Sequence, residues 1–235
     1  MENIPLKNNT NNVFPPYERL QSLIFQIYLA LLVKPKKVLE IGIGNEFVSS
    51  YLKKFCEVTT ADIDQKLQPD IVLDISEEED FKQVQNDYYD LIIICEVLEH
   101  IPFVKLDSVL NQLRKKTKKF VLISVPNESN ALVMSYHRKG YIKKLYLPII
   151  LPIKLVTMII NRIYSSLSNL HYKFIRSKLK FAYDGQHHWQ LGIDKYSVNL
   201  FREKLKAFFK IKYELRLNEN LYHHFFLLEK NNKAV

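Results

Sequence analysis

The ten residues from Val38 to Phe47, VLEIGIGNEF, restrict the fold of this chain more than any other stretch. An apolar run reaches Gly42 and Gly44, and a helical pattern follows. A strand that enters a helix through two glycines brings bare backbone close to a ligand at the carboxyl end of that strand. A dinucleotide-binding turn prefers a further glycine at position 47, where this chain has Phe47. The turn therefore favours a ligand other than a pyrophosphate.

Strand and helix patterns alternate through the first half of the chain. We expect helices over residues 17–33, 45–55 and 103–116, and strands over residues 37–41, 57–61, 70–73, 90–95 and 120–125. Two alternating stretches near the end, over residues 211–217 and 223–229, predict an antiparallel hairpin. Together these elements predict an α/β fold with a parallel sheet and an antiparallel edge.

Acidic residues accompany the predicted strands. Glu40 precedes the glycine turn, and Asp62 ends the next strand, 22 residues later. Asp74 follows the third strand, and Glu96 follows the fourth. A single aspartate here is most simply a turn or capping residue. Taken together, and without the lysine of a phosphate loop, the acids favour a nucleoside ligand that carries a positive charge.

Four motifs, VLEIGIGNEF, ADID, PDIVLDI and YDLIIICEVLEHIP, resemble the successive motifs of class I S-adenosylmethionine-dependent methyltransferases. The resemblance covers about residues 36–127, and the C-terminal hairpin fits the last two strands of that family. It implies a Rossmann-like, mostly parallel seven-stranded sheet and S-adenosyl-L-methionine as the cofactor. It assigns the cofactor turn to Glu40, Gly42 and Gly44, the ribose to Asp62, the adenine to Asp74 and Ile75, and the methionine end to Glu96.

Glu46 departs from this family pattern, which often has a third glycine there. Its side chain would crowd the methionine end of the cofactor if it pointed inward. An acid near a helix N-terminus is favoured by about 0.3–1 kcal/mol, so an outward orientation is also reasonable. We expect the protein to bind the cofactor despite Glu46. The alternatives are a non-catalytic binding protein with a weakened cofactor site and, disfavoured by Phe47, a nicotinamide oxidoreductase.

Glu96, Glu99 and His100 bring two carboxylates and an imidazole together within five residues. Such a cluster suits general acid–base chemistry or the binding of Mg²⁺ or Mn²⁺. The spacing resembles that of some metal-dependent O-methyltransferases, including small-RNA 2′-O-methyltransferases and quinone-pathway enzymes. A fourth ligand would then be His187 or His188. Relatives that bind no metal have similar residues in this motif, so we assign no metal ligand. We predict His100, His187 and His188 as catalytic.

The stretch GQHHWQLG, residues 185–192, holds these two histidines and Trp189, the only tryptophan. Two interpretations stay open: an ordered loop around a packed tryptophan, and a group that positions the acceptor or takes its proton. We interpret His223 and His224, at the start of the last strand, as structural.

Basic charge is concentrated in residues 129–183, which hold ten Lys and Arg and no Asp or Glu, in a chain with a net charge of +9. We expect one methyltransferase domain over residues 1–235, with a helical insertion over residues 128–183 after the fifth strand. Its apolar run, residues 145–160, is shorter than the roughly 20 residues of a spanning helix. A lid on the sheet and a contact with anionic lipid headgroups both fit this segment.

The two cysteines lack metal-type spacing, and the N-terminal stretch lacks a signal-peptide pattern. These features predict a cytoplasmic protein, with peripheral contact at the inner membrane face as an option. The acceptor that we expect is a small or lipid-linked molecule, methylated on oxygen by in-line transfer. Basic and aromatic residues also serve nucleic-acid binding, but no sequence-reading motif supports that partner.

Overall fold

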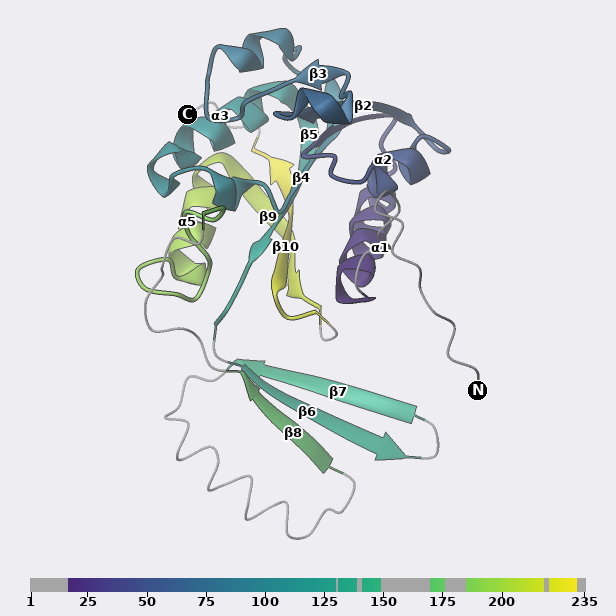
Figure 1. Cartoon of the computed structure of the whole chain (residues 1–235), viewed down its shortest axis with the longest axis vertical. Helices are drawn as coiled ribbons and strands as arrows, with labels where there is room; N and C mark the ends of the chain where they lie inside the picture. Colours follow the sequence, from purple (N-terminus) through teal and green to yellow (C-terminus); the bar gives the residue numbers. More distant parts are fainter. Residues whose placement is uncertain are drawn as a thin grey trace.

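Seven strands form one sheet in the computed structural model, which describes residues 17–129, 131–138, 141–148, 170–175, 185–217 and 220–231 (Figure 1). In spatial order they are β3 (Ile71–Val72), β2 (Glu57–Asp62), β1 (Lys37–Ile41), β4 (Tyr89–Cys95), β5 (Thr117–Pro126), β10 (His223–Lys230) and β9 (Phe209–Arg216). The first five pair in parallel, and β10 is antiparallel to β5 and β9. The predicted fold class, a Rossmann-like, mostly parallel seven-stranded sheet with an antiparallel C-terminal hairpin, is confirmed.

The strand order reverses between β1 and β4. The chain runs outward from β1 to β2 and β3, and it returns to β4 on the other side of β1. The loops that follow β1 and β4 therefore diverge, and they leave a crevice at the carboxyl ends of the strands. This crevice is where the predicted acids meet.

Helices cover both faces of the sheet. In Figure 1, α1 (Tyr17–Leu32) and α2 (Phe47–Leu52) lie on one side, and α3 (Leu106–Lys116) and α5 (Val198–Phe208) lie on the other. Four short 3-10 helices are η1 (Gln65–Leu67), η2 (Asp80–Gln83), η3 (Leu98–His100) and η4 (Phe103–Lys105). Within the described ranges, none of the helices has the length and apolar character needed to cross a membrane.

Two buried clusters, one on each face, hold these helices to the sheet. Successive side chains of a strand point to opposite faces. Val38 and Ile93 therefore join the cluster that includes residues of α1 and α2, whereas Leu39 and Ile92 join the cluster that includes residues of α3 and α5. Both faces of β4 are covered, which explains its uninterrupted apolar run.

Three predicted elements are clearly shortened or divided in the structure, and the ends of several others shift by one to three residues. The helix after the glycine turn is shorter than expected, because Glu46 has a left-handed backbone with φ of 58° and α2 begins only at Phe47. The predicted helix over residues 103–116 is split into η4 and α3, and the third strand is reduced to two residues. These differences leave the topology unchanged.

The predicted helical insertion is wrong wherever the structure describes it. The described parts are strands β6 (Ala131–Arg138), β7 (Tyr141–Pro148) and β8 (Leu170–Ile175), which form an antiparallel sheet in the order β7-β6-β8. Strands β6 and β7 pair antiparallel from Ala131 with Pro148 to Arg138 with Tyr141. Residues 149–169 and 176–184 lie outside the described residues. The single-domain division of the chain stays a prediction.

Candidate active site

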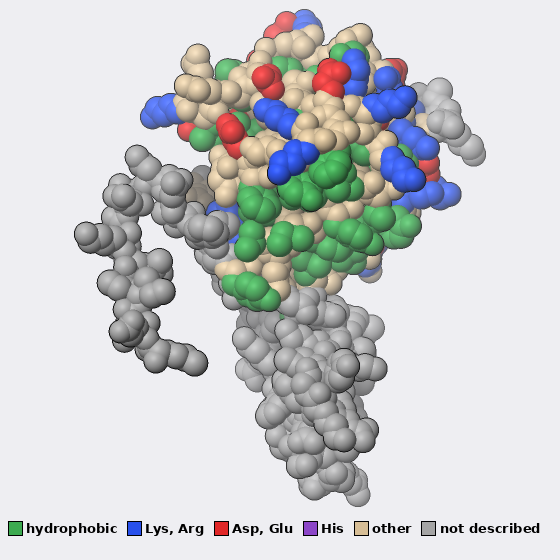
Figure 2. Space-filling model, turned by 90° about the vertical axis from the view of Figure 1, so that its right-hand side faces the viewer, with side chains coloured by type: hydrophobic (Ala, Val, Ile, Leu, Met, Phe, Trp, Pro, Cys, Tyr) green, Lys and Arg blue, Asp and Glu red, His purple; other side chains and the backbone are tan. Residues whose placement is uncertain are grey.

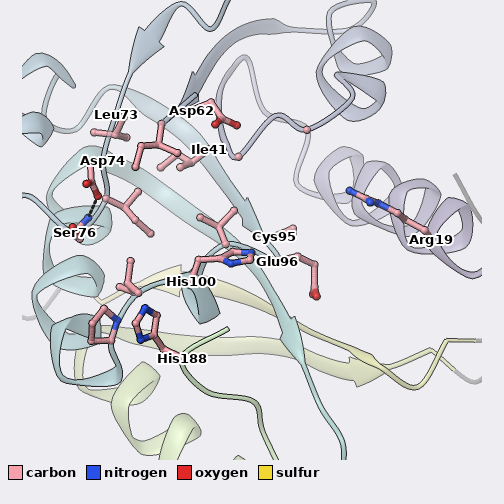
Figure 3. Close-up of a pocket in the computed structure, with 17 residues that line it drawn as sticks. Arg19, Ile41, Asp62, Leu73, Asp74, Ser76, Cys95, Glu96, His100 and His188 are labelled. Atoms are coloured by element: carbon pink, nitrogen blue, oxygen red, sulfur yellow. Dashed lines mark hydrogen bonds between the residues drawn. The ribbon is translucent and has the colours of Figure 1, made fainter. Parts of the chain in front are cut away.

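A cavity of about 540 Å³ occupies the crevice at the carboxyl ends of the strands (Figure 3). Its volume is in the range of small-molecule sites. Of the predicted site residues, the cavity is lined by Gly42, Gly44, Asp62, Asp74, Ile75, Glu96, His100 and His188. It is also lined by residues that were not predicted, among them Arg19, Ile63, Ser76 and Val97. The crevice therefore unites side chains from four strand ends with one residue of α1.

The backbone at Gly42 lies close to the side chain of Val97, and the glycine turn predicts such a close approach. Its φ is +82°, and a Cβ atom built on it would lie 2.3 Å from Cγ2 of Val97. Its N–H donates to the carbonyl of Ala61 at 2.8 Å, which ties the turn to β2. Neither the backbone conformation nor the available space admits another residue at this position.

Asp62 serves both of the roles that its position suggests. Its carboxylate accepts hydrogen bonds from the N–H groups of Ile43 and Asp64, both at 2.9 Å. These bonds hold the glycine turn against the end of β2. The same carboxylate lines the cavity, and each of its oxygens has a second lone pair for a ligand.

Asp74 and Ile75 form the part of the cavity wall next to Asp62, together with Leu73, whose N–H donates to the Asp62 carbonyl at 2.9 Å. The Asp74 carboxylate accepts the N–H of Ser76 at 2.8 Å, drawn as a dashed line in Figure 3. The Asp74 N–H donates to Asp80 at 3.0 Å. Leu73 and Ile75 are buried, so an apolar surface lies beside a fixed polar loop. This arrangement suits a flat, weakly polar ring such as adenine.

Glu40 lies behind the turn rather than in the main cavity. It lines a smaller cavity of about 60 Å³ together with Ser22, Gln26 and His223. Its side chain is buried, and its Oε2 atom has no hydrogen-bond partner among the described residues. Burial raises the pKa of Glu40 to about 7, although hydrogen bonds from Ser49 act in the opposite direction. The smaller cavity shares Arg19, Gly42, Gly44 and Glu96 with the main one, and the cofactor-binding role of Glu40 stays a prediction.

The raised pKa of Glu40 predicts a pH-dependent loss of stability. The folded protein holds the proton more tightly than the unfolded chain, so the free energy of unfolding falls as the pH rises from 4.5 to about 7. Glu40→Gln removes this contribution. We expect the free energy of unfolding of Glu40→Gln, relative to that of the wild type, to increase by about 3 kcal/mol across that window and then to stay constant. Urea unfolding at several pH values measures it, and a constant difference would show that Glu40 titrates normally.

Glu96 is held in a strained conformation at the end of β4. Its φ is 55°, a left-handed value that is uncommon for a residue other than glycine and is typical of functional sites. One carboxylate oxygen accepts the Ser124 hydroxyl at 2.8 Å, and the other lies 3.4 Å from Nε2 of His223. Burial raises the pKa of Glu96 to about 8, against the opposing effects of Ser124 and Arg19. The carboxyl group is therefore turned away from His100 (Figure 3).

Glu99, His100 and His187 form a compact cluster beside the cavity. Their ligand atoms lie within 4.8 Å of one another, an arrangement that fits a metal ion. Glu99 is 1% exposed, and neither of its carboxylate oxygens has a hydrogen-bond partner among the described residues. Burial and the nearby Glu96 raise its pKa well above the ordinary value. A buried carboxylate without donors is costly unless it is protonated or meets a cation.

The 185–192 loop fits both interpretations left open by the sequence. Trp189 is fully buried, and its Nε1–H donates to the carbonyl of Ile101 at 3.1 Å. His187 and His188 are partly exposed instead. The His188 N–H donates to the carbonyl of Glu99 at 2.7 Å, and the Nδ1 atom of His100 lies 3.0 Å from the carbonyl oxygen of Gln186. The packed tryptophan thus anchors the loop, and the histidines face the site.

A family model described as a methyltransferase domain matches residues 17–168, more than half of the chain. This chain belongs to the methyltransferase family. The predicted resemblance to class I S-adenosylmethionine-dependent methyltransferases is confirmed, and so is the predicted cofactor at the level of the family. A search of curated proteins found no match to this chain.

Solved methyltransferase structures share the fold. The N-methyltransferase NodS from Bradyrhizobium japonicum WM9, in complex with S-adenosyl-L-homocysteine, has a TM-score of 0.54 and 9% identity over 92% of this chain and 89% of that one. Magnesium protoporphyrin IX methyltransferase from Synechocystis PCC 6803 has a TM-score of 0.54 and 12% identity over 94% of this chain and 90% of that one. The small RNA methyltransferase HEN1 has a TM-score of 0.55 and 12% identity over 95% of this chain and 26% of that one. At these identities the similarity concerns the fold.

Two basic side chains of the methyltransferase site were not among the predicted site residues. Arg19 extends from α1 toward the cavity (Figure 3), and its Nη2 atom is 3.9 Å from the position that a Cβ on Gly44 would take. His223, interpreted as structural, lies beside Glu96 in the smaller cavity, and burial lowers its pKa to about 4. Neither residue belongs to a motif, so only the packing of α1 and β10 brings them to the site.

Glu46 does not obstruct the methyltransferase cavity. Its side chain is exposed, and it is not among the residues that line either cavity described above. Its left-handed backbone is the conformation that the missing glycine would adopt easily, and it costs a residue with a side chain about 1–2 kcal/mol. The departure from the family pattern therefore affects stability more than the space for a cofactor.

Proposed function

We propose that this methyltransferase transfers a methyl group from S-adenosylmethionine to an oxygen atom of a small or lipid-linked acceptor. One observation carries the choice of oxygen: the cavity wall at His100 adjoins a second imidazole, His187, and the unpartnered carboxylate of Glu99. A hydroxyl acceptor must lose a proton during transfer, and these groups supply a base or a cation site where the acceptor would enter. A sulfonium methyl needs no further activation.

The cavity fits the cofactor part by part. Asp62 has lone pairs for the ribose hydroxyls, and Asp74 with Ile75 borders a wall suited to the adenine. Gly42 and Gly44 leave the turn without side chains where the methionine part would pass. We assign the carboxylate of that part to Arg19 and its ammonium group to Glu96, because both side chains flank the turn. A bound ammonium group would favour the ionised form of Glu96, whose pKa is raised by burial.

The chain's own contribution to transfer is alignment and proton removal. Binding both substrates in one cavity holds the acceptor oxygen in line with the sulfur–methyl bond. His100 is the first candidate for the base, because it lines the cavity and its Nδ1 atom is oriented by the Gln186 carbonyl, which leaves Nε2 for the acceptor. His187, with its ring centre 5.0 Å from that of His100, is the second.

Glu99, His100 and His187 would hold a divalent cation if one is bound. Two imidazoles and one carboxylate suit Mn²⁺ or a similar transition ion better than Mg²⁺, which prefers oxygen ligands. Such an ion would polarise the acceptor hydroxyl and lower its pKa. The sequence alone led us to assign no metal ligand, and the fit of these three side chains is the reason to revise that assignment.

Calorimetric titration of the protein with S-adenosylmethionine and, separately, with NADH tests the proposal. We expect micromolar affinity for the first and none for the second. Asp62→Ala should weaken binding by about 10- to 100-fold, because a charged acceptor loses its hydrogen bonds. Asp64→Ala is the matched control, since Asp64 is exposed and does not line the cavity.

Other outcomes of this titration contradict the proposal. Binding of NADH alone would indicate an oxidoreductase. Binding of neither compound would favour a non-catalytic protein with a weakened site, in which case Glu46→Gly is the variant to compare. Equal losses in Asp62→Ala and Asp64→Ala would mean that the loop, rather than the ribose contact, controls binding.

Arg19→Ala should show which end of the cofactor Arg19 contacts. We expect the affinity for S-adenosylhomocysteine to fall about 10- to 100-fold, because a charge-assisted hydrogen bond is lost. Methylthioadenosine lacks the amino-acid group, so its affinity should stay unchanged. Arg19→Lys should restore part of the loss. A parallel loss for both ligands in Arg19→Ala would assign Arg19 to the shape of the cavity instead of the carboxylate.

A further inference from the structure

Helix α1 departs from the usual pattern of a surface helix, because two of its polar residues are buried and several of its apolar residues are exposed. Its polar residues Ser22 and Gln26 are buried, and the Ser22 hydroxyl accepts a hydrogen bond from the Asn220 side chain at 2.9 Å. Its solvent side carries Ile24 and Tyr28, which are 53% and 55% exposed. Surface helices normally present charged or polar residues to water. The outward side of α1 therefore has the composition of a face that is covered.

The apolar surface continues onto α2, which packs against α1. Phe47, Tyr51 and Phe55 follow one another at helical spacing and are 36%, 39% and 60% exposed. Together with Ile24, Tyr28 and Leu32 they define the α1–α2 face. Figure 2 shows hydrophobic side chains gathered on this side of the molecule. Soluble proteins rarely expose a contiguous apolar patch of this kind without a partner.

Lysines border the α1–α2 face. Lys34 and Lys36 follow α1, Lys53 and Lys54 follow α2, and all four are exposed. The ammonium group of Lys54 lies 5.3 Å from the ring centre of Tyr51. Among the residues whose exposure the structure describes, the exposed acids next to α2 are fewer, namely Glu46 and Glu57. Aromatic and aliphatic side chains within a border of lysines match a bilayer surface, where rings enter the headgroup region and ammonium groups meet lipid phosphates.

We propose that the α1–α2 face docks on the surface of an anionic lipid bilayer. Charge decides between this occupant and a second copy of the chain, because pairing the face with itself would bring two lysine borders to one interface. The face is also next to the cavity, since Arg19 on α1 lines it. Docking there would hold the cavity close to lipid-linked acceptors. The proposed contact is separate from the one predicted for residues 129–183, and it does not depend on the acceptor.

Sedimentation with lipid vesicles tests the docking. Vesicles of phosphatidylcholine are compared with vesicles that also contain phosphatidylglycerol. We expect Ile24→Gln/Tyr28→Ser to lower the partition coefficient on the mixed vesicles at least about tenfold, because half-exposed apolar surface no longer enters the bilayer. Lys53→Gln/Lys54→Gln should weaken binding to the mixed vesicles only, by a factor that shrinks as salt is added.

The matched control is Val104→Ser/Leu200→Gln. Val104 and Leu200 are 88% and 40% exposed, and they lie on η4, which directly precedes α3, and on α5. Figure 1 shows α3 and α5 on the other side of the sheet from α1. We expect this double variant to bind vesicles as the wild type does. Titration of each variant with S-adenosylhomocysteine keeps the two proposals apart, because docking and cofactor binding use different residues.

Three results would overturn the docking. The first is no sedimentation of the wild type, which would mean that the protein does not bind these vesicles, or equal sedimentation of Ile24→Gln/Tyr28→Ser, which would assign the membrane contact to another segment. The second is a dimer in analytical ultracentrifugation that this variant dissociates, without vesicle binding. The third is a lower unfolding midpoint in the same variant, again without vesicle binding, which would mean that the chain itself covers the face.

Discussion

Gly42→Ala is expected to abolish measurable binding of S-adenosylhomocysteine and to lower the free energy of unfolding by about 2–4 kcal/mol. The backbone at this position has φ of +82°, and the added Cβ would stand 2.3 Å from Cγ2 of Val97. Either the turn or the loop after β4 must move, and both line the cavity. Calorimetric titration and urea unfolding measure the two effects on the same preparation.

Two further variants separate the backbone conformation from the steric clash. Gly185 has φ of +90° with no atom within 4 Å of a built Cβ, so Gly185→Ala should show the cost of the conformation alone, about 1–2 kcal/mol. Val97→Ala added to Gly42→Ala removes the atom that clashes, and we expect it to restore part of the binding. If the single variant Gly42→Ala binds the ligand normally, the turn does not contact the cofactor.

Glu99→Gln should lower the affinity for Mn²⁺ by more than about 100-fold while leaving the protein folded, because it removes the only charged ligand of the proposed set. In the absence of metal the same change should raise the free energy of unfolding, since it replaces a buried carboxylate whose oxygens have no hydrogen-bond donor. Electron paramagnetic resonance reports bound Mn²⁺ without requiring a known acceptor. Opposite effects on metal affinity and on apo-protein stability are the expected signature.

His188→Asn is the control for the metal site. His188 lines the cavity but does not belong to the cluster, so Mn²⁺ affinity should change by less than about twofold. Equal losses in His188→Asn and Glu99→Gln would assign Mn²⁺ binding to the order of the whole loop. Absence of Mn²⁺ binding by the wild type would assign Glu99 to a protonated structural role and leave His100 as the base.

The sheet and most of the cofactor site could be predicted because their signals are local. The glycine turn, the apolar run of β4 and an acid at each strand end are all set by a few neighbouring residues. Parallel strands then bring their carboxyl ends to one edge of the sheet, whatever the loops do. For this reason Gly42, Asp62 and Asp74 could be placed at one edge of the sheet from the sequence, and the resemblance to the family assigned them to the cofactor.

The insertion was misinterpreted because its pattern is ambiguous. Residues 141–148, YIKKLYLP, form strand β7, although short apolar stretches of this kind also fit helices. The pairing that distinguishes the two is with β6, and pairing is not visible in the composition of one strand.

The sequence by itself determined the family, the topology of the sheet and the residues of the turn, since each depends on short-range spacing. Only the tertiary structure decided which groups join them. Arg19 comes from a helix far earlier in the chain, and Glu99 meets His187 across 88 residues of sequence. The packing also places Glu40 in the smaller cavity and Asp62 in the main one, although both side chains are buried. Such contacts depend on how helices and loops pack on the sheet, and no local pattern specifies that packing.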